Sequence, residues 1–305
     1  MPTTKHKAYL ALMATSIVWG TTWVAMKMGV KGMPPLQLAA IRQLMGGTFL
    51  VVMFLIRGHQ MPDIHQLLRL LGIGIFTFVI ANGLATLSLS YISSGLGALI
   101  AALYPLCVVM IEFVFFKNKN ITWTTVVGIF LGFSGIALVF YDNAFHTNVS
   151  HAHYFWGVVL ATVSMLAWSI STILIAKAKM QVSPYMGIGW QMLFSGIILY
   201  TYCLATHTHI PIVQIPAISW WSIVYLVVLG SVITMMAFVY TMKNLPTAVA
   251  ALYAYINPIV AVFVGFFLLN EVITLNIILG SVITVVGVYI VKWSMTKAAA
   301  KIAAA

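Results

Sequence analysis

Long apolar runs alternate with short polar breaks along the whole chain. A helix rises about 1.5 Å per residue, so about 20 consecutive apolar residues span the hydrocarbon of a bilayer. We predict one transmembrane helix for each of ten runs: 8–27, 35–56, 67–87, 95–116, 122–141, 155–176, 185–206, 219–241, 247–268 and 274–292. The two longest breaks, 142–154 and 207–218, are polar and are predicted to be loops. The pattern indicates an all-α polytopic membrane protein.

The composition agrees with this pattern. Of the 305 residues, 62% are hydrophobic and only 6% are charged, whereas a soluble domain carries about a quarter charged residues. The first run continues from Ala8 through Trp19 and Trp23 with no small-residue cleavage pattern, so we expect a retained helix. Cys107 and Cys203 both lie in apolar runs and are interpreted as small buried filler.

The basic residues predict the orientation of the chain. If the N-terminus is cytoplasmic, the inner loops and tails hold twelve of the fifteen Lys and Arg. They are Lys5, Lys7, Arg57, Arg69, Lys117, Lys119, Lys177, Lys179, Lys243, Lys292, Lys297 and Lys301. Lys and Arg in short loops are retained on the cytoplasmic side, so both termini are expected there. The net charge of +11 is therefore read as topology and not as nucleic-acid binding.

The two halves of the chain repeat one another, at offsets of about 150 residues. The matched positions are Trp19 with Trp168, Gln43 with Gln191, Pro105 with Pro258, and Thr122, Gly128 and Gly135 with Thr274, Gly280 and Gly287. We predict a first five-helix repeat over 1–145 and a second over 146–305. An odd number of helices per copy gives the copies opposite orientations, a design typical of secondary transporters with a substrate site near the midplane.

Two stretches resemble a known family. The run from Trp19 to Lys27, then Met33-Pro34-Pro35 and Ala39-Ala40-Ile41-Arg42, resembles the opening of EamA-type transporters of the drug/metabolite transporter superfamily. Pro258, followed by Asn270-Glu271 and Thr274, resembles the end of that family's second repeat. The resemblance implies a ten-helix, inverted-repeat exporter of amino acids or related metabolites. The first copy departs from the pattern, since Lys119 stands where the family often has a glutamate matching Glu271.

Ionisable residues within or close to the runs need a physical reason, because a charge at the bilayer centre costs about 2.5–3.5 kcal/mol on insertion scales. Arg42 has two interpretations: a clamp for a substrate carboxylate, or a structural arginine bonded to helix carbonyls or to a lipid phosphate. Glu112 is either a carboxylate that titrates during proton coupling or one partner of a rim ion pair with Lys117 or Lys177. For Glu271 we expect a packing or gate contact.

Aromatic and amide side chains predict a central pocket. The candidate substrate-binding residues are Trp19, Trp23, Gln43, Asn82, Tyr104, Trp168, Trp190, Gln191, Tyr253 and Asn257. Aromatic faces suit an apolar or cationic part of a substrate. The alternative is an interfacial belt of Trp and Tyr at headgroup depth, which fits Trp123, Trp156, Trp220, Trp221 and Trp293 near the predicted helix ends.

Prolines and glycines within the runs suggest how the helices bend and pack. Pro105 and Pro258 are candidate gating residues, because a proline frees backbone carbonyls where a helix lines a cavity. Gly128 and Gly132 have the spacing that lets membrane helices approach closely, within a monomer or in a weak homodimer. His146, His151 and His153 cluster in an outer loop without further soft ligands, and we expect no metal there.

Several function classes lack their motifs in this sequence. No G-x-x-x-x-G-K-[ST] loop, H-E-x-x-H or G-x-S-x-G occurs, which argues against nucleotide hydrolysis and intramembrane catalysis. We therefore predict a multi-pass exporter of the bacterial inner membrane that works by alternating access, with proton coupling as one option and without a cofactor. Its partners are a small-molecule substrate and the lipid bilayer. Import or exchange of a metabolite and lipid flipping remain the alternatives.

Overall fold

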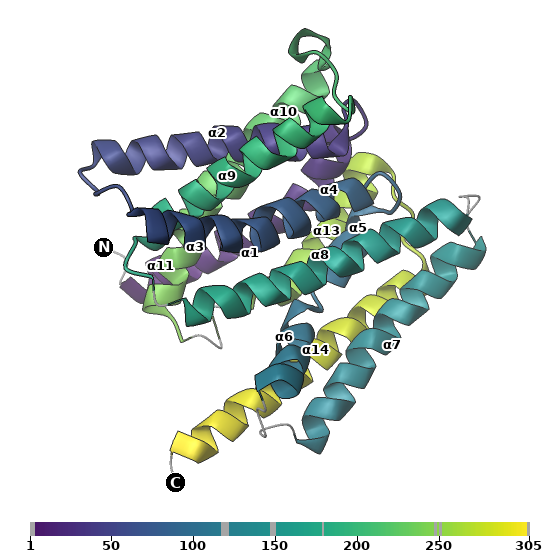
Figure 1. Ribbon diagram of the computed structural model, residues 1–305. Coiled ribbons are helices and arrows are strands. Elements are labelled where there is room, and N and C mark those ends of the chain that lie inside the picture. Colours follow the sequence, from purple (N-terminus) through teal and green to yellow (C-terminus); the bar gives the residue numbers. More distant parts are fainter. Residues whose placement is uncertain are drawn as a thin grey trace.

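The computed structural model describes residues 4–116, 122–146, 151–178, 180–246, 249 and 252–303. These residues form helices and connecting turns, with no strand among them (Figure 1). The α-helices are α1 (Thr4–Gly29), α2 (Pro35–Ile56), α3 (Ile64–Gly74), α4 (Gly83–Ser88), α5 (Ser94–Ala101), α6 (Tyr104–Phe116), α7 (Trp123–His146), α8 (His151–Lys177), α9 (Pro184–Ala205), α10 (Ala217–Tyr225), α11 (Thr234–Asn244), α13 (Tyr253–Leu269) and α14 (Leu275–Ala303). Between them lie two π-helical segments, η1 (Ile75–Asn82) and η3 (Leu226–Ile233), and one short 3₁₀ turn, η2 (Ile212–Gln214).

The ten predicted spans are confirmed. Nine helical stretches in the described chain are long and apolar enough to cross a bilayer, and the shorter apolar helix Tyr253–Leu269 supplies the remaining one. The helices run back and forth, and Figure 1 shows both chain ends on the same side of the bundle. Large apolar side chains such as Phe130, Trp221 and Phe267, each 72% exposed, cover the outside. This surface suits hydrocarbon and not water.

Two loop predictions need correction. The gap at 142–154 is shorter than predicted, because α7 continues to His146 and α8 already begins at His151. Polar residues there extend each helix past the apolar run, which hydropathy alone does not detect. The connection at 207–218 includes η2, and α10 begins at Ala217. Lys117, Lys119 and Lys179, which entered the orientation argument and the comparison of repeats, lie outside the described residues.

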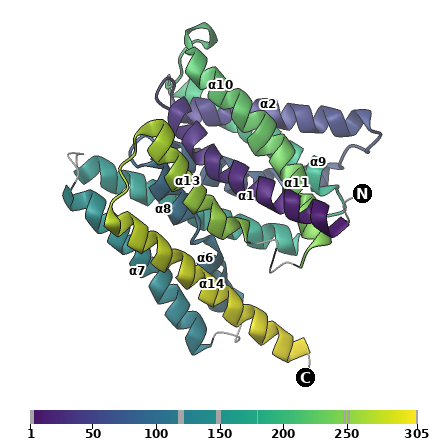
Figure 2. The same ribbon diagram turned by 180° about the vertical axis from the view of Figure 1, so that it is seen from behind.

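Two helix pairs bring their backbones close together. α7 and α14 run side by side along one edge of the molecule in both views (Figures 1 and 2). A Cβ added to Gly128 would lie 2.8 Å from the carbonyl oxygen of Gly287, and one added to Gly135 would lie 2.5 Å from that of Gly280. The small residues of the two spans therefore face each other within one chain.

The pair α2 and α9 packs in the same way. A Cβ on Gly47 would lie 2.4 Å from the backbone nitrogen of Leu193, and one on Gly196 would lie 2.7 Å from that of Leu44. α1 contacts α10, α11, α13 and α5, and Figure 2 shows it between α13 and α11. The fold thus places α1 next to helices from the other half of the chain.

Three of the spans depart from a regular α-helix. π-helical turns bond each N–H to the carbonyl five residues back and are frequent at functional sites; η1 and η3 place such turns in the middle of the third and eighth spans. The fourth span is broken where α5 ends at Ala101 and α6 begins at Tyr104. Pro105 therefore occupies the first turn of α6, whereas Pro258 lies inside α13.

Candidate functional site

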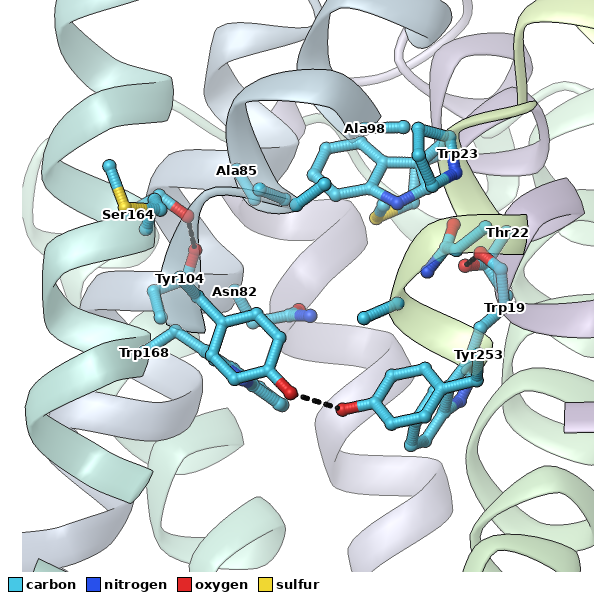
Figure 3. A pocket seen from close by; sticks show the side chains of 18 of the residues that line it. Trp19, Thr22, Trp23, Asn82, Ala85, Ala98, Tyr104, Ser164, Trp168 and Tyr253 are labelled. Atoms are coloured by element: carbon cyan, nitrogen blue, oxygen red, sulfur yellow. Dashed lines mark hydrogen bonds between the residues drawn. The ribbon is translucent and has the colours of Figure 1, made fainter. Parts of the chain in front are cut away.

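A cavity of about 160 Å³ lies among α1, α2, η1, α4, α5, α6, α8 and α13 (Figure 3). An engineered protein cavity of about 150 Å³ binds benzene, so this one has room for a small molecule or for part of one. Most of the predicted site residues line it: Trp19, Trp23, Arg42, Asn82, Tyr104, Trp168, Tyr253, Asn257 and Pro258. The helices that carry these residues come from both halves of the sequence.

Aromatic rings form one side of the cavity. The ring centroids of Trp19 and Tyr253 are 5.0 Å apart in an edge-to-face arrangement, and Trp19 also contacts Phe238 at 5.1 Å. Phe238 in turn lies 5.3 Å from Tyr253. Edge-to-face packing favours aromatic pairs, so these three rings fix one another in place. Phe238 was not predicted, because a single phenylalanine in a predicted transmembrane run carries no signal that distinguishes an inward face.

Two tyrosine hydroxyls meet across the cavity. Tyr104 Oη and Tyr253 Oη are 3.0 Å apart, which is a hydrogen bond between α6 and α13 (Figure 3). Tyr104 begins α6 directly after the break in the fourth span, and Tyr253 begins the described part of α13. The bond therefore links the two helices that carry Pro105 and Pro258.

Carbonyls of both π-helical segments accept hydrogen bonds from side chains at the cavity. Trp19 Nε1 donates to the carbonyl oxygen of Gly230 in η3 at 3.1 Å. Ser164 Oγ donates to that of Ala81 in η1 at 2.6 Å. Buried backbone carbonyls need such partners. Ser164 lines the cavity and was missed by the sequence analysis, since a lone serine in an apolar run carries no positional signal.

The amide side chains form a second polar group. Gln43 Nε2 donates to Asn82 Oδ1 at 2.8 Å, so Gln43 stands behind Asn82 and orients it toward the cavity. Asn257 Oδ1 is buried and has no hydrogen-bond partner. A buried acceptor without a donor is costly and needs an explanation. A donor on a bound molecule would satisfy it.

Arg42 lies in α2 and is only 8% exposed. Its Nε donates to Ser231 Oγ at 3.3 Å, and its Nη1 contacts Met26 Sδ at 3.6 Å. Both are long contacts to weak acceptors. The guanidinium is thus placed at the wall of the cavity with most of its donors available.

The remaining predicted residues are not among those that line the cavity. Gln191 accepts a 3.4 Å hydrogen bond from Thr77 Oγ1, so it contacts the third span. Trp190 packs against Phe194 with the ring centroids 5.5 Å apart, and its Nε1 is buried and unpartnered. Glu112 is half-buried on α6, and the next three positions, 113–115, are exposed. Pro105 follows the lining residue Tyr104 in the chain.

A set of hydrogen bonds joins the helices at the end of the bundle where α1 ends, which we call the Gly29 end. Glu271 accepts from the backbone nitrogen of Ser94 at 2.7 Å and from Ser94 Oγ at 2.8 Å, at the N-terminus of α5. Lys27 Nζ donates to the carbonyl oxygens of Leu89 at 2.5 Å and Ile92 at 2.9 Å. The loop before α5 is therefore held by the carboxylate of Glu271, in the segment after α13, and by the amine of Lys27 in α1. For Glu271 this is a packing contact, one of the two kinds expected.

We predict that Glu271→Ala lowers the melting temperature of the purified protein by several degrees. The substitution leaves the first N–H groups of α5 without their acceptor, and loss of a helix cap costs about 0.5–2 kcal/mol. Glu271→Gln keeps one acceptor oxygen and is expected to lose less. Thermal unfolding in detergent measures both, and an unchanged melting temperature for Glu271→Ala would show that the cap contributes nothing.

The predicted histidine cluster is described only in part. His153 packs edge-on against Tyr91 with the ring centroids 6.0 Å apart, whereas the side chains of His146 and His151 lie outside the described residues. Cys107 and Cys203 are both buried and free, as the sequence predicts.

The helices, the apolar surface and the inner cavity together define a polytopic membrane protein with an internal small-molecule site. The model of the EamA-like transporter family matches this chain twice, over residues 6–141 and 155–293. The chain belongs to this family and is a membrane transporter of the drug/metabolite type.

Individual relatives agree with this assignment. The inner membrane transporter YedA of Escherichia coli (strain K12) is 30% identical over 258 residues, covering 84% of this chain and 80% of YedA. The transporter YoaV of Bacillus subtilis (strain 168) is 22% identical over 303 residues, covering 95% and 98%. A solved crystal structure shares the fold with a TM-score of 0.64 at 17% identity, covering 93% of this chain and 95% of the other. YedA and YoaV are both named as transporters.

Proposed function

We propose that this protein is a secondary carrier that exports amino acids or related small metabolites by alternating access. The observation that supports it most is the central cavity, whose lining comes from α1, α2, η1, α4, α5 and α6 of the first half and from α8 and α13 of the second. A site formed where two repeats meet is the arrangement that allows rocking of one repeat against the other to change its access.

Reciprocal contacts support an inverted repeat, with the halves at 1–145 and 146–305. Gly128 and Gly135 are matched in the sequence by Gly280 and Gly287, and the contacts pair Gly128 with Gly287 and Gly135 with Gly280. Each glycine of α7 therefore contacts the counterpart of the other glycine of α7. Reciprocal contacts of this kind are typical of two-fold symmetry.

The helices α2 and α9 give the same relation. Gly47 meets Leu193 and Gly196 meets Leu44, and each leucine stands three residues before the glycine of its own helix. Gly47 and Gly196 are separated by the same 149 residues as Trp19 and Trp168. Two independent helix pairs therefore support a two-fold relation between the halves.

Contacts at the cavity follow this relation as well. The carbonyls of Ala81 and Gly230, again 149 residues apart, each accept a side-chain hydrogen bond from the first helix of the other half. Tyr104 and Tyr253 have the same separation and bond to each other. A residue that meets its own equivalent lies at the axis, so we place the axis through this tyrosine pair.

The moving parts in this proposal are the fourth and ninth spans. The fourth span is broken just before Pro105, the ninth has Pro258 inside α13, and each contributes one tyrosine of the bonded pair. In one state, the Tyr104–Tyr253 hydrogen bond would break and the cavity would open at that side. In the other state, Glu271 would separate from Ser94 and the cavity would open at the Gly29 end. The break and the internal proline supply the flexibility that such gates need.

The lining indicates the kind of substrate. Rings of Trp19, Trp23, Trp168 and Tyr253 surround an apolar or cationic part of the substrate, and the small volume limits that part to roughly the size of one ring.

The positive-inside distribution supports cytoplasmic N- and C-termini in a bacterial inner membrane. The α7 and α14 glycines are occupied within the chain, which favours a monomer.

Counterflow in proteoliposomes tests this proposal. Vesicles loaded with one unlabelled compound are expected to accumulate the same radiolabelled compound transiently, from a panel of amino acids, nucleosides and polyamines. Acceleration by a pH gradient that is lost in Glu112→Gln, with exchange retained, would support proton coupling through Glu112. If folded protein moves no compound on the panel and instead equilibrates fluorescent phospholipids between leaflets, the flippase alternative replaces the proposal.

A further inference from the structure

We infer that the substrate carries a carboxylate that binds to Arg42. The inference rests on the proposed carrier function and adds the chemical class of the substrate. Arg42 is a positive charge within a transmembrane span and is more than nine-tenths buried at the cavity wall. Such a charge is costly in a membrane protein and marks a functional site unless a partner within the protein compensates it.

The described part of the protein provides no compensating charge. The contacts of Arg42 are the hydroxyl of Ser231 at 3.3 Å and the sulfur of Met26 at 3.6 Å, and no carboxylate pairs with it among the described residues. A guanidinium has five N–H donors in a planar fork. A carboxylate that approached from the cavity would accept two of these donors at once, which is the strongest pairing open to an arginine.

The structural roles open to Arg42 are not supported by its contacts. Neither acceptor is a backbone carbonyl, although Ser231 belongs to η3, where a π-helical turn offers such carbonyls. The carbonyl of the neighbouring Gly230 accepts from Trp19 instead. A lipid phosphate would require exposure on the outer surface, whereas Arg42 faces the internal cavity and is 8% exposed.

A second group at the cavity complements this anion site. Asn257 Oδ1 is a buried acceptor without a donor, and it lines the same cavity as Arg42. A substrate with both a carboxylate and an N–H or O–H donor would satisfy both groups, and the aromatic rings would enclose its side chain. Amino acids and hydroxy acids have this combination, whereas polyamines and nucleosides lack the carboxylate.

The test uses matched probes on purified protein. The probes are L-alanine, L-threonine, L-leucine and L-phenylalanine, each compared with its carboxamide, in which the carboxylate is replaced by a neutral group of the same shape. Because Trp19, Trp23 and Trp168 line the cavity, tryptophan fluorescence reports occupancy. We expect at least one acid to bind and its amide to bind at least tenfold more weakly. Amides that bind as well as the acids, or acids that all fail to bind, would overturn the inference.

Variants of Arg42 complete the test. Arg42→Gln is expected to lose at least tenfold in affinity for the acid and to remove the difference between acid and amide, and Arg42→Lys to retain part of both. Arg69→Gln makes the same change of charge at an exposed arginine of α3 and is expected to bind like the wild type. Acid binding by Arg42→Gln at wild-type affinity would contradict the assignment.

The stability of the empty protein separates a binding role from a structural one. An uncompensated buried charge destabilises the empty site, so Arg42→Gln without ligand is expected to melt at or above the wild-type temperature. A clear loss of melting temperature would assign Arg42 to packing and overturn the inference. The carboxylate site can fail while the carrier proposal stands. Counterflow of a compound without a carboxylate, at equal rates in wild type and Arg42→Gln, would support the carrier and contradict only the carboxylate site.

Discussion

Leucine at position 287 is expected to abolish correct folding of the protein. A Cβ at Gly287 would already lie 2.4 Å from the backbone nitrogen of Gly132 and 2.7 Å from the carbonyl oxygen of Gly128. The obstacles are backbone atoms of α7, so no rotamer change relieves them. Overpacking a close-packed interior costs about 1–3 kcal/mol, occasionally more, and here the two helices must separate. Size-exclusion chromatography of the solubilised protein should show loss of the monodisperse peak.

Gly72→Leu is the matched control. Gly72 lies in α3, and a Cβ built there meets no atom within 4 Å. The same substitution at this exposed position is expected to leave the elution profile and the melting temperature nearly unchanged. If Gly287→Leu behaved like Gly72→Leu, the close approach of α7 and α14 would be contradicted.

Alanine at position 19 is expected to lower the initial rate of counterflow by more than tenfold. The change removes the ring that contacts Tyr253 and Phe238 and the indole donor to the carbonyl of Gly230. That carbonyl then lies beside the cavity without its partner, and the tyrosine loses a neighbour that fixes its position. Trp168→Ala, on the other side of the cavity, is expected to act in the same direction.

Two further variants make this prediction specific. Trp19→Phe keeps an aromatic ring and loses only the hydrogen bond, so it should retain more transport than Trp19→Ala. Trp221→Ala removes a tryptophan that is 72% exposed on the outer surface and should transport like the wild type. Equal rates for Trp19→Ala and Trp221→Ala would show that the ring at position 19 does not serve the transport route.

The sequence predicts the spans well because bilayer thickness fixes their length. The run 35–56 corresponds to α2 (Pro35–Ile56) without a shift, since proline punctuates its start and Arg57 follows its end. The π-helical segments could not be predicted in this way. Leu226–Ile233 reads as an ordinary apolar run, and the hydrogen bond that its Gly230 carbonyl accepts comes from Trp19, which is about 210 residues away in the sequence.

The sequence predicts which types of residue line the site, but not which way each side chain faces. Trp168 and Trp190 both lie inside apolar helices, yet Trp168 lines the cavity and Trp190 packs against Phe194. A helix that is apolar on every side carries no amphipathic signal, so only tertiary contacts decide which face turns inward. Ser164 in α8 was missed for the same reason.

Labelling of a cysteine inside the cavity tests the central claim most directly. Ala98 lines the cavity and is 2% exposed, and Ala98→Cys in a background with Cys107→Ser and Cys203→Ser gives one reactive position there. The protein is labelled in detergent with a bulky methanethiosulfonate and then reconstituted, with Gln60→Cys in an exposed loop as control. The account predicts that substrate slows labelling at position 98 and that the labelled carrier no longer catalyses counterflow, whereas the control does. Full counterflow by protein labelled completely at position 98 would contradict a transport route through this cavity.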